Sequence, residues 1–166
     1  MKNKKSLFLT QAAMIAALYV VLTELSNIFG LASFAVQIRF SEALTILPFF
    51  TPAAIPGLFI GCIIGNLIGG AILPDIIFGS LATLLGACFT YLLRTKSKYL
   101  APLPPIIANT LIIPFVLRYA YGVPLPTPFM MLTVGIGELI SCGGLGMILL
   151  TGLRKHHHNF FTSHIR

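Results

Sequence analysis

The chain has 166 residues, of which 57% are hydrophobic and only 9% are charged, with a formal net charge of +7. A soluble domain needs charges on roughly a quarter of its residues to cover its surface, so this composition excludes a water-soluble globular protein and indicates one surrounded by lipid. The positive charge does not indicate nucleic-acid binding, because the basic residues gather in short clusters between apolar runs and are not interleaved with aromatic residues.

The predicted elements are apolar segments that approach the length of a bilayer crossing, about 20 residues. In chain order they cover residues 8–29, 40–50, 57–73, 76–93, 105–119 and 129–153. The first is too long for the apolar part of a signal peptide, about 7–15 residues, so we expect it to be retained. We predict an all-α integral membrane protein with six transmembrane helices, one transmembrane domain over residues 1–153 and a polar tail over residues 154–166.

The second segment is the shortest of the six. As an α-helix its eleven residues rise only about 17 Å. We therefore expect it either to begin earlier, near Ser33, or to be completed by irregular backbone buried within the protein. Residues 51–57 contain two prolines and a glycine and are predicted to break the chain between the second and third segments. The third segment is predicted to end at Pro74.

The basic residues predict the orientation in the membrane. Six crossings place both termini on one side, together with the loop that contains residues 94–98. Three basic residues precede the first segment, three lie in that loop and three follow the last segment, which leaves only Arg39 and Arg118 on the other side. Because cytoplasmic loops carry an excess of Lys and Arg, both termini are predicted to be cytoplasmic.

The four acidic residues are candidates for function, because a carboxylate inside a membrane protein is costly to bury. Glu138 falls near the bilayer centre in the last segment, and Glu42 opens the second segment three residues after Arg39. Asp75 lies at the turn after the third segment, where capping the next helix is the alternative role. Glu24 lies near the outer end of the first segment and is either functional or an interface residue.

Amides and small residues follow other patterns inside the predicted helices. Asn66 and Asn109 are either ligand-binding groups or hydrogen-bond partners between helices. The first helix carries small residues spaced four apart, a pattern typical of close helix contact: Ala12, Ala13, Ala16 and Ala17. Gly135 and Gly137 flank Glu138 and are expected to leave room there for a planar ligand.

No constellation of catalytic residues emerges from the sequence. Cys62, Cys88 and Cys142 lack metal-ligand spacing and are expected to pack as small hydrophobic residues. The histidines lie in the C-terminal tail, where residues 156–158 either form a solvated end or bind a metal. The chain has no nucleotide-binding loop. We therefore expect no enzyme activity, no metal and no cofactor in this chain, and energy for transport must come from a partner.

Several segments resemble the QueT family, the substrate-binding S-components of energy-coupling-factor (ECF) transporters. The similar segments are residues 37–48, 51–62, 75–84 and 135–139, and the resemblance extends over residues 8–153. Its most specific parts are the Arg-Phe-Ser-Glu-Ala-Leu sequence that begins at Arg39 and the Asp-Ile-Ile-Phe-Gly-Ser sequence that begins at Asp75.

The resemblance implies a six-helix protein in the plasma membrane of a prokaryote that captures a queuosine precursor from outside the cell. Such a precursor is a 7-deazaguanine base or a related nucleobase. The implied partners are a transmembrane coupling subunit and two cytoplasmic ATPases that use ATP. The alanine pattern of the first helix matches the surface that S-components use against their coupling subunit.

The resemblance also implies roles for the candidate residues. A guanine-like face offers two adjacent donors that one carboxylate can accept together, and Glu138 is the first candidate for that role, before Glu42 and Asp75. An aminomethyl substituent would add a cation for a second carboxylate. Arg39 is expected either to contact a carbonyl oxygen or to hold Glu42 in place. The aromatic candidates for stacking on the base are Phe34, Phe40 and Phe78.

Two alternatives to a queuosine-precursor S-component stay open at this point. One is an S-component for another vitamin, since several share the architecture. The other is a self-sufficient proton-coupled carrier in which Glu138 relays protons. The missing catalytic groups argue against an intramembrane enzyme.

Overall fold

The computed structural model describes residues 2–31 and 37–160, with side chains for residues 4–31 and 37–155. In chain order its elements are α1 (Lys2–Ile28), η2 (Phe40–Phe49), α2 (Ala54–Ile68), α3 (Leu73–Leu93), η3 (Lys98–Leu100), α4 (Leu103–Tyr119), α5 (Thr127–Glu138), η4 (Leu139–Gly146) and α6 (Met147–Phe160). All regular structure in the described ranges is therefore helical, and the predicted all-α fold is confirmed.

Four helical stretches are long and apolar enough to cross a membrane. They are Lys4–Ile28, Leu73–Leu93, Lys98–Tyr119 and the continuous run Thr127–Lys155, while η2 and α2 are apolar but shorter. Large hydrophobic side chains point outward from these stretches: Leu9 is 70% exposed and Val21 is 62% exposed. Because a soluble protein rarely exposes extensive apolar surface, this outer face is suited to lipid.

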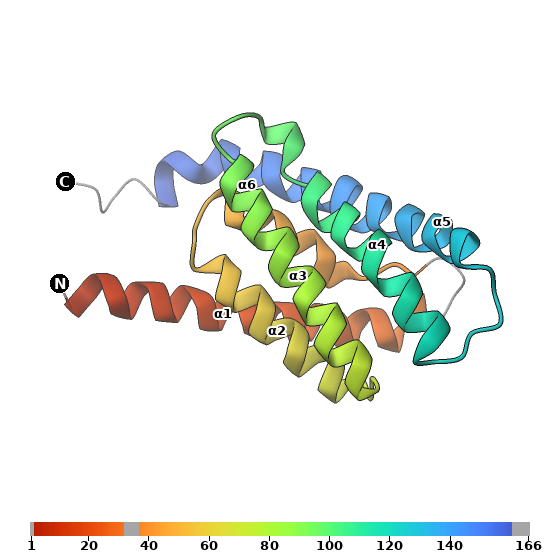
Figure 1. Ribbon diagram of the computed structural model, residues 1–166. Helices are drawn as coiled ribbons and strands as arrows, with labels where there is room; N and C mark the ends of the chain where they lie inside the picture. Colours follow the sequence, from red (N-terminus) through yellow and green to blue (C-terminus); the bar gives the residue numbers. More distant parts are fainter. Residues whose placement is uncertain (1, 32–36, 161–166) are drawn as a thin grey trace.

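The helices pack largely in chain order around a central segment. α1 lies against α2, α2 against α3, α3 against α4, and α4 against α5, while η2 contacts α1, α3 and η4 in the interior (Figure 1). The start of α1, the end of α6 and the connection between α3 and α4 lie at the same end of the bundle, at the left of Figure 1. The basic residues of the described part of these three clusters, up to Lys155, therefore lie at one end of the bundle.

η2 is a 3₁₀-helix and not a short α-helix. A 3₁₀-helix rises about 2.0 Å per residue, so its ten residues extend about 20 Å, farther than an α-helix of equal length. The residues just before it, 37–39, have no regular structure and are half-buried, which agrees with completion by protein-enclosed irregular backbone. Ser33, the alternative start, lies outside the described residues.

The break between η2 and α2 is shorter than predicted. Residues 51–57 were expected to be irregular, yet α2 begins at Ala54, because Pro56 lies in the first turn, where a backbone donor is not needed. The predicted end of this helix is also wrong, since α2 stops at Ile68 and not near residue 73. Gly70 has a φ of +75° and closes the helix in a Schellman motif, with the Ala71 amide donating to the Asn66 carbonyl at 2.9 Å.

The small residues of α1 pack against α2 within the chain. Ala12 and Ala16 are buried, and a Cβ added to Gly57 would lie 2.7 Å from the carbonyl oxygen of Ala12. A Cβ on Gly61 would lie 3.0 Å from the backbone of Ala16. The predicted partner surface must therefore be corrected, because two of its four residues face inward.

Ala13 and Ala17 lie on the exposed side of the same helix. They are the two alanines of the predicted pattern that remain accessible to a second protein.

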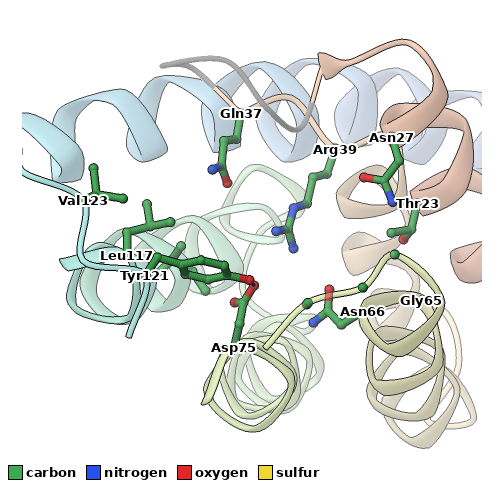
Figure 2. A pocket seen from close by; sticks show the side chains of 14 residues that line it. Thr23, Asn27, Gln37, Arg39, Gly65, Asn66, Asp75, Leu117, Tyr121 and Val123 are labelled. Atoms are coloured by element: carbon green, nitrogen blue, oxygen red, sulfur yellow. Dashed lines mark hydrogen bonds between the residues drawn. The ribbon is translucent and has the colours of Figure 1, made fainter. Parts of the chain in front are cut away.

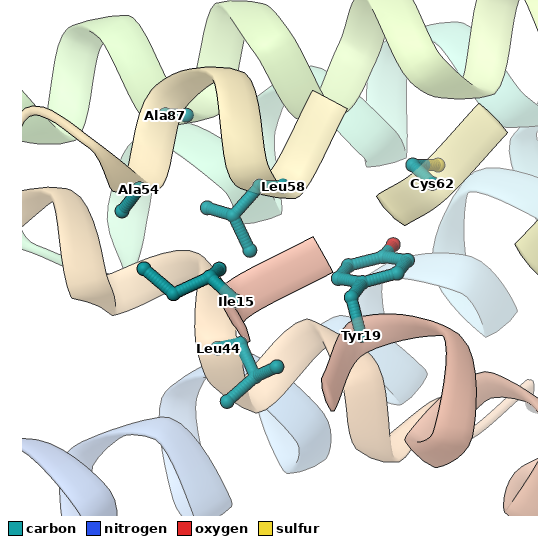
Figure 3. Close-up of a cluster of buried hydrophobic side chains, with 7 residues drawn as sticks. All are labelled: Ile15, Tyr19, Leu44, Ala54, Leu58, Cys62 and Ala87. Atoms are coloured by element: carbon teal, nitrogen blue, oxygen red, sulfur yellow. The ribbon is translucent and has the colours of Figure 1, made fainter. Parts of the chain in front are cut away.

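One apolar core cluster lies between α1, η2, α2 and α3. Its buried residues are Ile15, Tyr19, Leu44, Ala54, Leu58, Cys62 and Ala87 (Figure 3). The hydroxyl of Tyr19 and the thiol of Cys62 lie toward the same side of this cluster (Figure 3), and both groups make polar contacts there. The core therefore ends in a polar region in the interior of the bundle.

Candidate functional site

Two carboxylates from distant segments meet at one amide in the interior. The Nδ2 of Asn109 on α4 donates to Oε1 of Glu138 at 2.9 Å and lies 3.4 Å from Oε2 of Glu42. The hydroxyl of Tyr19 on α1 donates to Oε1 of Glu42 at 2.7 Å. Glu42 is 2% exposed and Glu138 is 9% exposed, so both carboxylates are removed from bulk solvent.

One oxygen of this cluster has no partner among the described residues. Oε2 of Glu138 is buried and accepts no hydrogen bond, whereas the other three carboxylate oxygens of the pair each accept one. A buried acceptor without a donor costs free energy, about 1–3 kcal/mol and more when it is charged. An unpaired buried oxygen of this kind marks a place where a ligand can supply the missing donor.

The backbone around Glu138 departs from α-helical geometry. Glu138 is the last residue of α5, and the next eight residues form the π-helix η4, near the middle of the Thr127–Lys155 stretch. π-helical segments occur frequently at functional sites. In η4 the hydroxyl of Ser141 accepts a hydrogen bond at 3.2 Å from the backbone amide of Arg39. This contact fixes the irregular segment before η2 beside the carboxylate pair.

Arg39 contributes the positive charge of the site. Its side chain lies along a cavity that opens between Asp75 and Thr23 (Figure 2). Within the described ranges no carboxylate lies within ion-pair distance of its guanidinium, so Arg39 does not form a salt bridge with Glu42. Because guanidinium presents five donors and keeps its charge, Arg39 is available to a ligand oxygen.

The cavity beside Arg39 has a volume of about 350 Å³. It is bordered by α1, α2, the start of α3 and the loop after α4. Its polar lining consists of Thr23, Asn27, Gln37, Arg39, Asn66, Asp75 and Tyr121. We call this space the outer compartment. Its volume falls within the range of about 300–1,000 Å³ that is usual for small-molecule sites.

Asp75 and Tyr121 form a pair at the edge of the outer compartment. The Tyr121 hydroxyl donates to Oδ2 of Asp75 at 2.9 Å and lies 3.4 Å from the backbone amide of Ile72. Burial raises the pKa of Tyr121, and the Asp75 carboxylate raises this pKa further, so the hydroxyl keeps its proton. Asp75 is therefore not the helix cap that the sequence offered as an alternative, since α3 begins at Leu73 and the Asp75 side chain faces the cavity.

A second, smaller space adjoins the first. It has a volume of about 20 Å³, and its polar lining consists of Gln37, Arg39, Glu42, Cys62, Thr83, Asn109 and Glu138. We call it the inner compartment. Gln37, Arg39 and Ile113 line both compartments, so the two spaces are neighbours on either side of these residues.

Comparison with known proteins identifies the family of the chain. The family model described as QueT transporter matches residues 9–155. The chain belongs to the QueT transporter family. With four helical stretches of spanning length, this membership indicates a multi-pass membrane protein.

A curated relative is the queuosine precursor transporter QueT of Lactococcus lactis subsp. cremoris (strain MG1363), which is 34% identical over 98 residues. The alignment covers 59% of this chain and 57% of the relative, so the chain spans little more than half the length of the protein it matches. No solved structure matches the chain. The family and the relative are both named as transporters and not as enzymes.

The structure of this QueT family member brings most of the predicted site residues together. Glu138, Glu42, Asn109 and Arg39 line the inner compartment. Asp75 and Asn66 line the outer compartment, and Arg39 connects the two spaces. Their roles in binding stay a prediction, whereas their proximity is a property of the fold.

Some predicted residues lie elsewhere. Phe78 is 49% exposed and borders an apolar groove between α3 and α4, so it does not line either compartment. Phe34 lies outside the described residues, and Phe40 does not line either compartment. The histidine side chains of residues 156–158 are also outside the part that the structure describes.

The glycines beside Glu138 serve packing and not ligand access. A Cβ on Gly137 would overlap the carbonyl oxygen of Gln37, and a Cβ on Gly135 would touch Thr110. Gly137 therefore allows the irregular segment before η2 to pass close to α5. The expectation that these two glycines leave room for a planar ligand is wrong.

Sequence reasoning missed several residues of the site. Tyr19, Asn27 and Tyr121 carry no motif, because each is an ordinary residue of an apolar helix or a loop, and Gln37 was noted only as the first residue of the 37–48 segment. For Tyr19 a usable signal existed: it follows Ala12 by seven residues and Ala16 by three, so it occupies the same helix face.

Proposed function

We propose that this chain is the substrate-binding subunit of an importer for a queuosine precursor, a 7-deazaguanine base or a related nucleobase. The observation that carries the proposal is the buried, unpartnered Oε2 of Glu138, a residue that lines the inner compartment. The family match and the printed name of the relative support the same substrate class.

The outer compartment suits a flat, polar base. Its lining offers both donors and acceptors: amides from Asn27, Gln37 and Asn66, the carboxylate of Asp75 and the guanidinium of Arg39. A guanine-like ring presents a carbonyl oxygen beside two N–H donors. In this proposal Arg39 contacts the carbonyl oxygen, and the carboxylate of Asp75 accepts the donors. Phe78 takes no part in this arrangement.

We further propose that the subunit acts as an ECF S-component. It would be driven by a transmembrane coupling subunit and two cytoplasmic ATPases that use ATP, and the chain itself would carry no cofactor. The sequence contains no nucleotide-binding loop, which agrees with ATP being used by other chains. Ala13 and Ala17 lie exposed on α1 and supply a small-residue surface for the coupling subunit.

The proposed topology has six membrane segments and cytoplasmic termini in the plasma membrane of a prokaryote. By length alone, η2 and α2 are too short to cross the membrane. However, η2 contacts several other helices in the interior, and irregular backbone such as the segment before it is tolerated in a membrane protein where other helices shield it from lipid. The described basic residues gather at the end of the bundle where α1 begins and α6 ends, as expected for a cytoplasmic end (Figure 1).

A binding panel tests the substrate. The purified protein in detergent is titrated by calorimetry with 7-deazaguanines, guanine, other purines and several vitamins. We expect binding of 7-deazaguanines and weak or absent binding of the vitamins. Binding of a vitamin with no binding of any deazaguanine would overturn the proposed substrate.

A self-sufficient carrier is the second candidate, and it is favoured by the buried carboxylate in the middle of a long helical stretch. Liposomes that contain only this protein distinguish the two functions. A proton-coupled carrier takes up labelled substrate when a pH gradient is imposed. An S-component shows uptake only when the coupling subunit and ATPases are added with ATP.

A further inference from the structure

We infer that the inner compartment is a cation subsite, and that the preferred substrate is a deazaguanine whose side group ends in a protonated primary amine. This inference rests on the proposed function and makes it more specific. It assigns the ring to the outer compartment and the ammonium group to the unpartnered Oε2 of Glu138.

The charges around the inner compartment favour a cation. Glu42 and Glu138 line it together with Arg39, the one basic residue in its lining. The hydrogen bonds to the two carboxylates come from the neutral donors Tyr19 and Asn109, and no described basic residue forms an ion pair with either. A buried carboxylate is favourable only when a cation or several donors compensate it, so an added cation would stabilise the ionised form of these two side chains.

The size of the inner compartment favours a small group. A volume of about 20 Å³ holds a group about as large as one water molecule. A primary ammonium group fits this space, whereas a fused two-ring base does not. From the sequence, Glu138 was predicted to accept hydrogen bonds from the N–H donors of the ring itself. The size of the inner compartment instead favours contact between Glu138 and a group that projects from the ring.

The two compartments lie on either side of the same three residues. Gln37, Arg39 and Ile113 line both spaces, so the proposal requires a one-carbon arm on a ring in the outer compartment to pass between these side chains. An ammonium has three donors and no acceptor. One donor satisfies Oε2 of Glu138, and the others can reach the second acceptor positions of the neighbouring carboxylate oxygens.

The test compares ligands that differ only in this group. Purified wild-type protein is titrated with 7-aminomethyl-7-deazaguanine, with 7-hydroxymethyl-7-deazaguanine, which is neutral and of similar size, and with 7-cyano-7-deazaguanine. We expect the aminomethyl compound to bind about ten- to a hundredfold more tightly than the two neutral compounds, as for a charge-assisted hydrogen bond.

Matched variants locate the effect. Glu138→Gln is expected to remove most of the preference for the aminomethyl compound, so that the three compounds bind the variant with similar affinities. Glu24→Gln is the control, because Glu24 also has a buried unpartnered oxygen but does not line either compartment. It should retain the wild-type preference. Thermal melting of each variant verifies that it is folded.

The outcomes separate the two proposals. Equal affinity of the wild type for charged and neutral compounds would overturn the cation subsite and leave the proposed function intact. An equal loss for all three compounds in Glu138→Gln would also overturn it, because it would place the ring edge at Glu138. If no deazaguanine binds to the wild type, both the proposed function and the subsite are wrong.

Discussion

The hydroxyl of Tyr19 donates a 2.7 Å hydrogen bond to Oε1 of Glu42, and this contact joins the first helix to the short 3₁₀-helix η2. Tyr19 is 1% exposed, and its ring belongs to the apolar core while its oxygen belongs to the polar site. One residue therefore connects core packing to the position of a carboxylate that lines the inner compartment.

Removing this hydroxyl should weaken substrate binding without unfolding the protein. Tyr19→Phe keeps the ring in the core but leaves Oε1 of Glu42 without its donor. Loss of a hydrogen bond to a charged group corresponds to about 1.5–3 kcal/mol, so we expect affinity for a deazaguanine to fall about tenfold or more. Calorimetric titration measures the change.

Tyr99→Phe is the matched control for this variant, because Tyr99 is 66% exposed in the connection between α3 and α4. It should bind substrate like the wild type. If Tyr19→Phe also binds like the wild type, the Tyr19 hydroxyl does not position Glu42 for binding.

Close contact between α1 and α2 should depend on Gly57. A Cβ at this position would lie 2.7 Å from the carbonyl oxygen of Ala12, which is backbone and cannot rotate away. Overpacking of a tight contact usually costs about 1–3 kcal/mol, so Gly57→Ala should lower the melting temperature in detergent. Gly144→Ala is the control, since its Cβ would meet only Leu139 at an ordinary 3.9 Å. Equal melting temperatures for the two variants would contradict this account of the contact between α1 and α2.

The sequence was sufficient to predict the helical class and the site residues that carry charge. Because a carboxylate is costly to bury inside an apolar bundle, Glu42 and Glu138 could be identified as candidates from the sequence alone. Their common partner, Asn109, was also a candidate, because an amide inside an apolar helix needs a hydrogen-bond partner.

Helix ends and orientations were predicted less well, because local patterns do not specify them. Pro74 was expected to end a helix, but Gly70 ends α2 and Pro74 lies in the first turn of α3. Alanines spaced four apart indicated close packing of α1, but the spacing does not say whether the neighbour is another helix of the chain or another protein. Only the three-dimensional arrangement shows that Ala16 faces α2.

The proposed orientation predicts which side of the membrane each loop faces. Single cysteines placed at Lys96 and at Arg154 should react with a membrane-impermeant reagent only in inside-out vesicles, because both belong to the basic end. A cysteine at Val123, in the loop between α4 and α5, should react only in intact cells. The native Cys88 is half-buried, so the parent protein without added cysteines serves as the blank. Reaction of position 96 from outside would overturn the six-segment topology.

The two faces of α1 should respond differently to a large side chain. Ala13 is exposed, so Ala13→Trp should leave substrate binding by the isolated protein intact but block assembly with the coupling subunit and hence ATP-driven uptake. Ala16 is 8% exposed and lies against Gly61, so Ala16→Trp should disturb the bundle itself and lower the melting temperature. Substrate titration, melting and uptake by the reconstituted complex are measured for both variants.

Leu9→Trp, at a position that is 70% exposed on the same helix, controls for the general effect of tryptophan in lipid. If Ala13→Trp supports normal uptake, this face of α1 does not bind the coupling subunit. If instead it loses substrate binding as severely as Ala16→Trp, Ala13 contributes to the internal packing and not to a partner surface.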